Sequence, residues 1–158
     1  MRKIQIIGYG VELPENTVSF NGQTRYRISG EEKQVSLAVL ACEKALENTG
    51  IKIDDIDCIV SASAVGIQPI PCMAALIHEK IAKGTSIPAL DINTTCTSFM
   101  TALDTMSYLV EAGRYKRVLI VSCDVASIAL NPKQKESFRL FSDGAVAFII
   151  EKTENETG

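Results

Sequence analysis

One continuous apolar run constrains the fold of this chain more than any other feature. Residues 117–123, RVLIVSC, are almost entirely hydrophobic and show no alternation of polar and apolar positions. A strand with this pattern is typical of a largely parallel sheet that helices cover on both faces. The chain has 158 residues, the length of one ordinary domain, so we treat residues 1–158 as a single domain.

The rest of the sequence alternates between strand and helix patterns. Further strands are predicted at 3–8, 57–64, 87–92 and 145–151. Helices are predicted at 33–49, 72–83 and 96–112, and a glycine follows each of them. Two segments have no clear pattern: residues 9–32 are polar and rich in turn formers, and residues 124–140 are mixed. This alternation predicts an α/β fold with a mostly parallel sheet and helices on both faces.

Composition excludes several classes of protein. The formal net charge is −3 with both signs interspersed, which argues against nucleic acid as a partner. No apolar run approaches the roughly 18 residues that span a bilayer, and the first apolar run is too short for a signal peptide. We therefore expect a cytoplasmic protein with no membrane partner.

The cysteines predict free thiols. They lie at positions 42, 58, 72, 96 and 123, without a CxxC pair, and the single histidine is His78. An odd number of cysteines without an export signal indicates a reducing compartment. Because paired ligand spacing is absent, we expect no metal site.

Cys96 lies where the predicted strand 87–92 gives way to a helix. The N-terminus of a helix presents unpaired N–H groups and a partial positive charge, which favour a thiolate and stabilise an oxyanion. This placement suits acyl transfer through a thioester. The alternative is a small buried hydrophobe, which is what we expect of Cys42, Cys58 and Cys123. Cys72 also opens a helix, so position alone leaves it as a second candidate.

A cysteine nucleophile commonly works with a histidine base within hydrogen-bond reach. His78 lies in mid-helix beside Glu79 and Lys80, where we expect a solvated surface side chain. A base for Cys96 is therefore not expected among these residues.

Five segments resemble β-ketoacyl-acyl-carrier-protein synthase III, a member of the thiolase-like superfamily, in the family's own order. TTCTSF (94–99) resembles its active-site cysteine segment, and IIGYGVELPENTV (6–18) its opening strand and loop. The other three segments are KALENTGIKIDDIDCIVSASA (44–64), AGRYKRVLIVSCD (112–124) and RLFSDGAVAFIIE (139–151). Together they extend over essentially the whole chain.

This resemblance implies a thiolase-like fold of two similar α/β halves in five layers, α-β-α-β-α. The chain is similar to the N-terminal half only, with a five-stranded mixed, mostly parallel sheet. In the family, the catalytic His and Asn belong to the C-terminal half, so the chain alone is not expected to turn over.

The resemblance also implies a reaction and its site residues. Cys96 accepts an acyl group from a CoA or carrier-protein thioester, and decarboxylative condensation with a malonyl thioester follows, without any cofactor. Phe141 matches a residue lining the acyl pocket, and Lys135 a basic residue near the CoA entrance. Ile70 matches a residue that reaches into the partner subunit's pocket in the family's homodimer. Ordinary core packing remains the alternative for Ile70 and Phe141, and a solvated loop charge for Lys135.

The sequence departs from the family pattern in two places. The segment FNGQTRYRISGEEK (20–33) is shorter than usual, and the chain lacks the tryptophan that stacks on the CoA adenine. The usual Phe-Gly-Asp-Gly-Ala-Gly-Ala is Phe-Ser-Asp-Gly-Ala-Val-Ala at 141–147, which places a branched side chain at Val146. These changes indicate a divergent subgroup.

Two other functions remain open. The chain could be a non-catalytic subunit or scaffold, associating as a homodimer or with a complementary C-terminal half. It could also transfer an acyl group to an acceptor other than malonyl.

Overall fold

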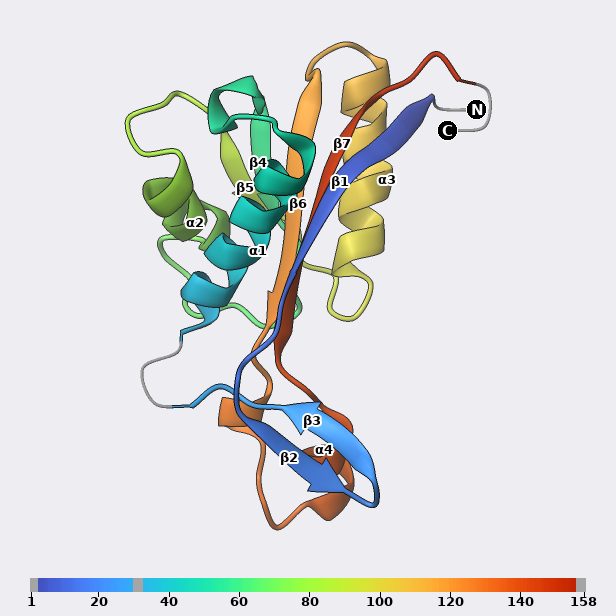
Figure 1. Ribbon diagram of the computed structural model, residues 1–158. Helices are drawn as coiled ribbons and strands as arrows, with labels where there is room; N and C mark the ends of the chain where they lie inside the picture. The colour runs from blue at the N-terminus through green and yellow to red at the C-terminus, as the bar shows by residue number, and fades with distance from the viewer. Residues whose placement is uncertain (1–2, 30–32, 156–158) are drawn as a thin grey trace.

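Five strands form one mixed sheet in the order β1-β7-β6-β4-β5 (Figure 1). The computed structural model describes residues 3–29 and 33–155. The strands are β1 (Ile4–Glu12), β4 (Cys58–Ser61), β5 (Ala89–Asp91), β6 (Arg117–Asp124) and β7 (Gly144–Lys152). Strands β5, β4 and β6 are parallel, whereas β7 runs antiparallel to both β6 and β1. Four strands therefore point one way, which confirms the predicted mixed, mostly parallel sheet.

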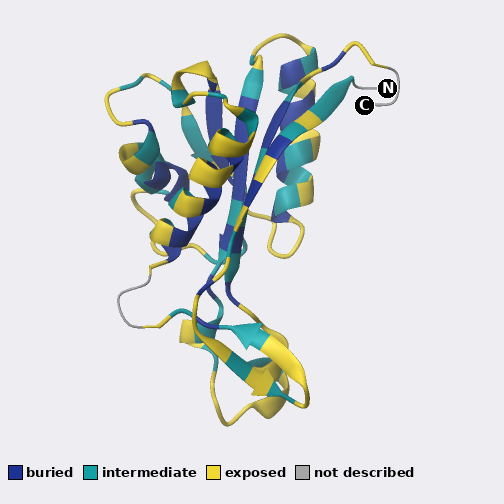
Figure 2. Cartoon of the chain, in the orientation of Figure 1, coloured by how far each residue is buried: buried dark blue, intermediate teal, exposed yellow. Residues whose placement is uncertain are grey.

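Helices cover both faces of this sheet, as predicted. Helices α1 (Gln34–Thr49) and α2 (Met73–Ile81) pack on one face, and α3 (Ser98–Glu111) packs on the other. Strand β6 supplies Leu119 and Val121 to the first core and Val118 and Ile120 to the second. Its apolar run is continuous because both of its faces are buried, as Figure 2 shows for the central strands.

Helix α1 lies unusually close to β1. A Cβ atom at Gly10 would collide with the Ala41 carbonyl oxygen and crowd the Ala45 nitrogen on α1. A Cβ atom at Gly8 would collide with the side-chain methyl of Thr49 instead of with backbone. Glycine is therefore required here for packing, and the alternating Gly-x-Gly turns Tyr9 toward the opposite face of the sheet.

Residues 9–32 are more regular than predicted. Strand β1 continues to Glu12, and a hairpin of β2 (Thr17–Phe20) and β3 (Gln23–Tyr26) follows. Asn21 and Gly22 have φ values of 51° and 78°, as a two-residue type I′ turn requires. The Asn-Gly pair was the available signal for this hairpin. Residues 30–32, the end of the predicted turn-rich segment, lie outside the described residues.

The mixed segment 124–140 packs against this hairpin. It contains η2 (Ser127–Ala129) and α4 (Lys135–Leu140). Phe138 of α4 meets Phe20 edge to face, with ring centroids 5.8 Å apart. Arg25 Nε donates to the carbonyl oxygens of Arg139 at 2.9 Å and Leu140 at 3.0 Å. The hairpin and α4 thus form a small unit at one end of the sheet (Figure 1).

Several boundaries differ from the predictions by a few residues. The strand predicted at 57–64 ends at Ser61, after a short η1 (Ile53–Asp55), and the one predicted at 87–92 keeps only Ala89–Asp91. The helix predicted from residue 96 begins at Ser98. No helix in the described ranges has the length and apolarity needed to cross a membrane.

Candidate active site

Cys96 lies in the short connection between β5 and α3, two residues before the helix begins. Its side chain is exposed, and its sulfur has no hydrogen-bond partner among residues 3–29 and 33–155. The exposure excludes the alternative of a small buried hydrophobe. The preceding residue, Thr95, has φ 57°, in the left-handed region that β-branched residues rarely adopt.

Side chains of the same loop hold this conformation. Asn93 Oδ1 accepts the Thr95 N–H at 2.9 Å, and the Asn93 amide Nδ2 donates to the Ala64 carbonyl at 3.2 Å. The Ser98 hydroxyl accepts the Thr94 N–H at 3.0 Å and donates to the Thr95 carbonyl at 2.6 Å. Ser98 itself is buried, so its two bonds are partly shielded from water, whereas the two bonds of Asn93 are exposed. The backbone on both sides of Thr95 is therefore held by side chains.

The loop that follows β4 contacts the Cys96 loop through the Ala64 carbonyl and is itself held by hydrogen bonds. Asp124 Oδ1 accepts the Val65 N–H at 2.7 Å. The buried Gln34 side chain donates to the carbonyls of Val65 and Cys123, both at 2.6 Å. Because the carboxyl ends of parallel β4, β5 and β6 lie at one edge of the sheet, these groups meet there. Asn93, Ser98, Gln34 and Asp124 were not among the predicted site residues.

Only one of these residues carried a sequence signal. An Asn two residues before the N–H that it accepts is typical of an Asx turn, so Asn93 could have been found. The bonds of Gln34 and Asp124 join segments 31 to 89 residues apart, and no local pattern predicts them.

Asp91, the last residue of β5, holds the start of α2 at the same edge of the sheet. Its carboxylate accepts the N–H groups of Met73 at 2.9 Å and Ala74 at 2.8 Å, which caps the start of α2. Ile70 lies just before that helix, and 86% of its surface is exposed. Core packing within this chain is therefore excluded for Ile70.

Phe141 and Lys135 lie at the opposite ends of α4. Phe141 follows the helix and is 44% exposed, so it is not a core residue of this chain. Lys135 begins the helix, is exposed, and lines an open cavity of about 570 Å³ formed by residues 133–137. Within the described part of the chain, no hydrogen bond or ring contact joins either residue to Cys96. Their roles stay predictions.

The other thiols occupy different environments. Cys42, Cys58 and Cys123 are fully buried, which confirms them as core residues. Burial raises the pKa of the Cys123 thiol to about 12, with the Asp124 charge as a smaller cause. Burial is also the first cause that raises the pKa values of Cys42 and Cys58 above the usual thiol range. Cys72 is half-buried and precedes α2.

His78 is less exposed than predicted. Its ring is half-buried, and Nε2 lies 3.2 Å from the Thr85 hydroxyl, because α2 ends beside the Thr85 turn. The expectation of a solvated side chain is thus wrong. Helix α2 packs on the face of the sheet opposite to α3, so His78 lies on the other side of the sheet from the cysteine helix. Among the described residues, no three His, Cys, Asp or Glu side chains converge as a metal site.

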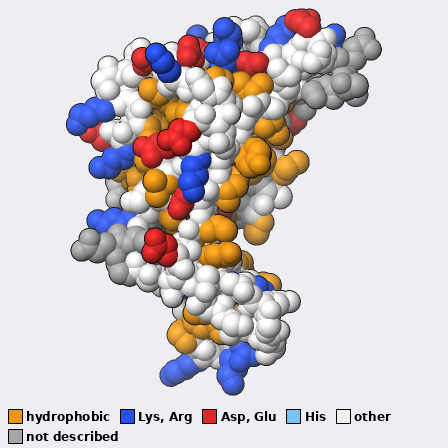
Figure 3. Space-filling model, in the orientation of Figure 1, with side chains coloured by type: hydrophobic (Ala, Val, Ile, Leu, Met, Phe, Trp, Pro, Cys, Tyr) orange, Lys and Arg blue, Asp and Glu red, His pale blue; other side chains and the backbone are white. Residues whose placement is uncertain are grey.

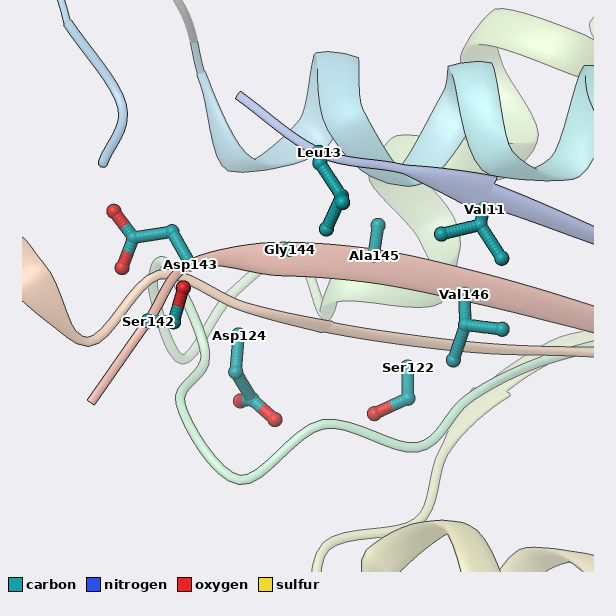
Figure 4. A pocket seen from close by; sticks show the side chains of 9 residues that line it. All are labelled: Val11, Leu13, Ser122, Asp124, Ser142, Asp143, Gly144, Ala145 and Val146. Atoms are coloured by element: carbon teal, nitrogen blue, oxygen red, sulfur yellow. The ribbon is translucent and has the colours of Figure 1, made fainter. Parts of the chain in front are cut away.

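A cavity of about 360 Å³ opens between β1, β6 and β7 (Figure 4). Val11 and Leu13 lie on one side, Ser122 and Asp124 lie on the other, and Val146 lies between them. The branched side chain that departs from the family pattern therefore faces this cavity.

Comparisons with known proteins agree on one family. A protein-family model described as 3-oxoacyl-[acyl-carrier-protein (ACP)] synthase III matches residues 90–158. A β-ketoacyl-[acyl-carrier-protein] synthase III of Clostridium perfringens is 33% identical over 100% of this chain and 54% of its own length. The synthase III of Bartonella henselae is 35% identical over 85% of this chain and 41% of its own length.

Solved structures share the fold. A 3-oxoacyl-[acyl-carrier-protein] synthase III from Aquifex aeolicus superposes with a TM-score of 0.90 and 24% identity, over 97% of this chain and 55% of that one. The priming β-ketosynthase of the R1128 polyketide biosynthetic pathway superposes with a TM-score of 0.87 and 22% identity, over 98% of this chain and 51% of that one. This chain spans about half the length of the curated relatives that it matches.

Proposed function

Because the chain belongs to the β-ketoacyl-acyl-carrier-protein synthase III family and corresponds to its N-terminal half, we propose that Cys96 is the acyl-accepting nucleophile of a condensing enzyme. The exposed position of Cys96 before α3 is the observation that carries this proposal. The product class would be fatty-acid or polyketide-type chains, as the names of the relatives suggest.

The proposed reaction has two steps. First, the Cys96 sulfur attacks the carbonyl carbon of an acyl thioester, and the CoA or carrier-protein sulfur leaves with the electron pair. Second, a malonyl thioester loses CO₂, and the resulting carbanion attacks the acyl-Cys96 carbonyl. The Cys96 thiol is released, and a 3-ketoacyl thioester forms. This scheme needs no cofactor: the first step exchanges one thioester for another, and in the second the electron pair of the broken C–CO₂ bond forms the new C–C bond as the Cys96 sulfur leaves.

This chain would perform only the first step. Condensation in the family uses a His and an Asn from the C-terminal half, and the single histidine here lies on α2 with its ring beside Thr85. A complementary C-terminal half would complete the site. Acyl-CoA and acyl carrier protein are the proposed partners.

Mass spectrometry of the intact chain tests the proposal. Incubation with acetyl-CoA should add one acetyl group to the wild-type chain and none to Cys96→Ala, whereas Cys72→Ala should behave as wild type. Acetylation of Cys96→Ala at the wild-type rate would refute the role of Cys96. Steady turnover with acetyl-CoA and malonyl-carrier protein would refute the claim that this chain performs only the first step.

An exposed apolar strip favours a second candidate, a subunit that acts through association. Ile6, Tyr9 and Val11 on β1, together with Leu13 just beyond it, are 42% to 59% exposed. In the view of Figure 3, hydrophobic side chains gather along the middle of the molecule, in the region where Figure 1 shows β1. Strand β1 is an edge strand, since β7 is its one neighbour in the sheet among the residues that the structure describes. An exposed apolar edge strand is a typical site for pairing with another chain.

A further inference from the structure

We propose that Asn93 is a positioning residue that sets the place of the Cys96 thiol by holding Thr95 in its left-handed conformation. The inference rests on the proposed nucleophilic role of Cys96 and deepens it. Asn93 would act through the backbone of Thr95 and would not touch the acyl group.

The conformation of Thr95 needs support from outside the residue. Its φ of 57° brings a β-branched side chain into a region that glycine occupies without penalty and threonine seldom does. The N–H of Thr95 is held by Asn93 Oδ1 at 2.9 Å, and its carbonyl by the Ser98 hydroxyl at 2.6 Å. The strained residue is therefore clamped at both of its backbone polar groups.

Asn93 also anchors the clamp to the sheet. Its amide Nδ2 donates to the Ala64 carbonyl at 3.2 Å, and the adjacent Val65 is fixed by Asp124 and Gln34. Asn93 is thus a strut between the loop after β4 and the loop that carries Cys96. An ordinary Asx turn lacks this second connection.

The chain offers such an ordinary turn for comparison. Asn131 Oδ1 accepts the Lys133 N–H at 3.0 Å, with the same spacing of two residues. Asn131 is exposed in the η2–α4 connection, far along the chain from Cys96, and the described residues offer no hydrogen-bond partner for its amide nitrogen. Asn131→Ala therefore removes an Asx hydrogen bond of similar length and leaves both hydrogen bonds of Asn93 in place.

The consequence for Cys96 is geometric. Cys96 directly follows Thr95, and rotation about the Thr95 backbone displaces everything between it and α3. With the strut removed, Thr95 can relax to the common β or α region, and the sulfur leaves its place at the start of α3. The Cys96 sulfur reacts from this exposed place in front of α3, so displacement that turns it away from solvent should slow its reactions.

The test is the rate at which iodoacetamide alkylates Cys96 in the full chain, read by peptide mass spectrometry. Half-buried Cys72 serves as the reference in the same molecule. Asn93→Ala should slow Cys96 about fivefold, the effect expected from one lost hydrogen bond, and leave Cys72 within twofold. Thr95→Gly added to Asn93→Ala should restore the rate, because glycine adopts positive φ without support. Asn131→Ala should have no effect.

Each other outcome has a definite meaning. A wild-type Cys96 that reacts no faster than Cys72 would remove the nucleophile assignment and this inference together. A fast wild-type Cys96 that is unchanged in Asn93→Ala would overturn the positioning role alone. A slow Asn93→Ala variant that Thr95→Gly does not restore, or an equal loss in Asn131→Ala, would also overturn it. Equal slowing of Cys72 would indicate general loosening and count against the proposal.

Discussion

The carboxylate of Asp143 accepts a hydrogen bond of 2.9 Å from the backbone N–H of Ile28, which lies 115 residues earlier in the chain. The same carboxylate accepts the Ser127 N–H at 3.0 Å and the Ser127 hydroxyl. Asp143 is buried, so one side chain joins the exit of the β2–β3 hairpin, η2 and the start of β7. It holds the small hairpin unit to the sheet.

Asp143→Ala should strongly destabilise the chain. The substitution removes a buried carboxylate and leaves the part-buried donors of Ile28 and Ser127 without their acceptor, so we expect the free energy of unfolding to fall by about 2–4 kcal/mol. Urea denaturation followed by circular dichroism measures this change. Glu15→Ala, at an exposed position, is the control and should shift the free energy by less than about 0.5 kcal/mol. Equal effects of the two substitutions would contradict the role of Asp143.

Gly10→Ala should destabilise the packing of α1 on β1. The added methyl group would overlap the Ala41 carbonyl oxygen, which is backbone and cannot rotate away. Forced overpacking costs about 1–3 kcal/mol, which thermal or urea unfolding resolves. Gly66→Ala is the matched control, because the atom nearest to its Cβ is the Gln68 oxygen at 3.9 Å. A neutral Gly10→Ala would show that α1 can shift freely on the sheet.

Buried thiols should make the fold sensitive to alkali. An unfolded thiol ionises near its ordinary pKa of 9.0, whereas burial keeps Cys123 neutral to about pH 12. The folded state therefore binds more protons than the unfolded state in this window. The contribution of Cys123 to stability is complete below about pH 9 and is lost as pH rises toward 12.

Urea titrations between about pH 8 and about pH 10.5 measure this loss. Each buried thiol can contribute up to about 1.4 kcal/mol per pH unit once its unfolded form ionises. Cys123→Ala should flatten the decline of the free energy of unfolding above pH 9, and Cys96→Ala, at an exposed position, should leave the decline unchanged. An identical slope in the wild-type chain and both variants would show that ionisation of Cys123 does not contribute to the loss of stability in alkali.

The apolar strip of Ile6, Tyr9, Val11 and Leu13 should drive self-association at micromolar concentration. Ring contacts continue this surface from Tyr9 to Phe148 at 6.4 Å and from Phe148 to Phe99 at 5.0 Å. A lysine on an edge strand opposes pairing, so Tyr9→Lys should shift light scattering toward the monomer. Ile128→Lys, at a position 70% exposed outside the strip, should not. A clean wild-type monomer would refute the expectation.

Local patterns predicted the regular elements well where tertiary contacts agree with them. The helix at 33–49 was placed within one residue of α1, and Gly50 ends it with φ 69° as its position suggested. Strand β6 was recognised because burial on both faces removes alternation from its sequence. The hairpin at Asn21-Gly22 was missed although its signal is local.

The sequence by itself determined the α/β fold class and the family, and it singled out Cys96 as the proposed nucleophile. Hydrophobic periodicity, turn residues and the order of the motifs can all be recognised along the chain. Only the tertiary structure decided how Cys96 is held. Asn93, Ser98, Gln34 and Asp124 converge because three parallel strands end at one edge, and hydrogen bonds between residues up to 89 positions apart carry no periodic signal. Exposure, too, depends on what packs nearby, which is why His78 is less exposed than its place beside Glu79 and Lys80 suggested.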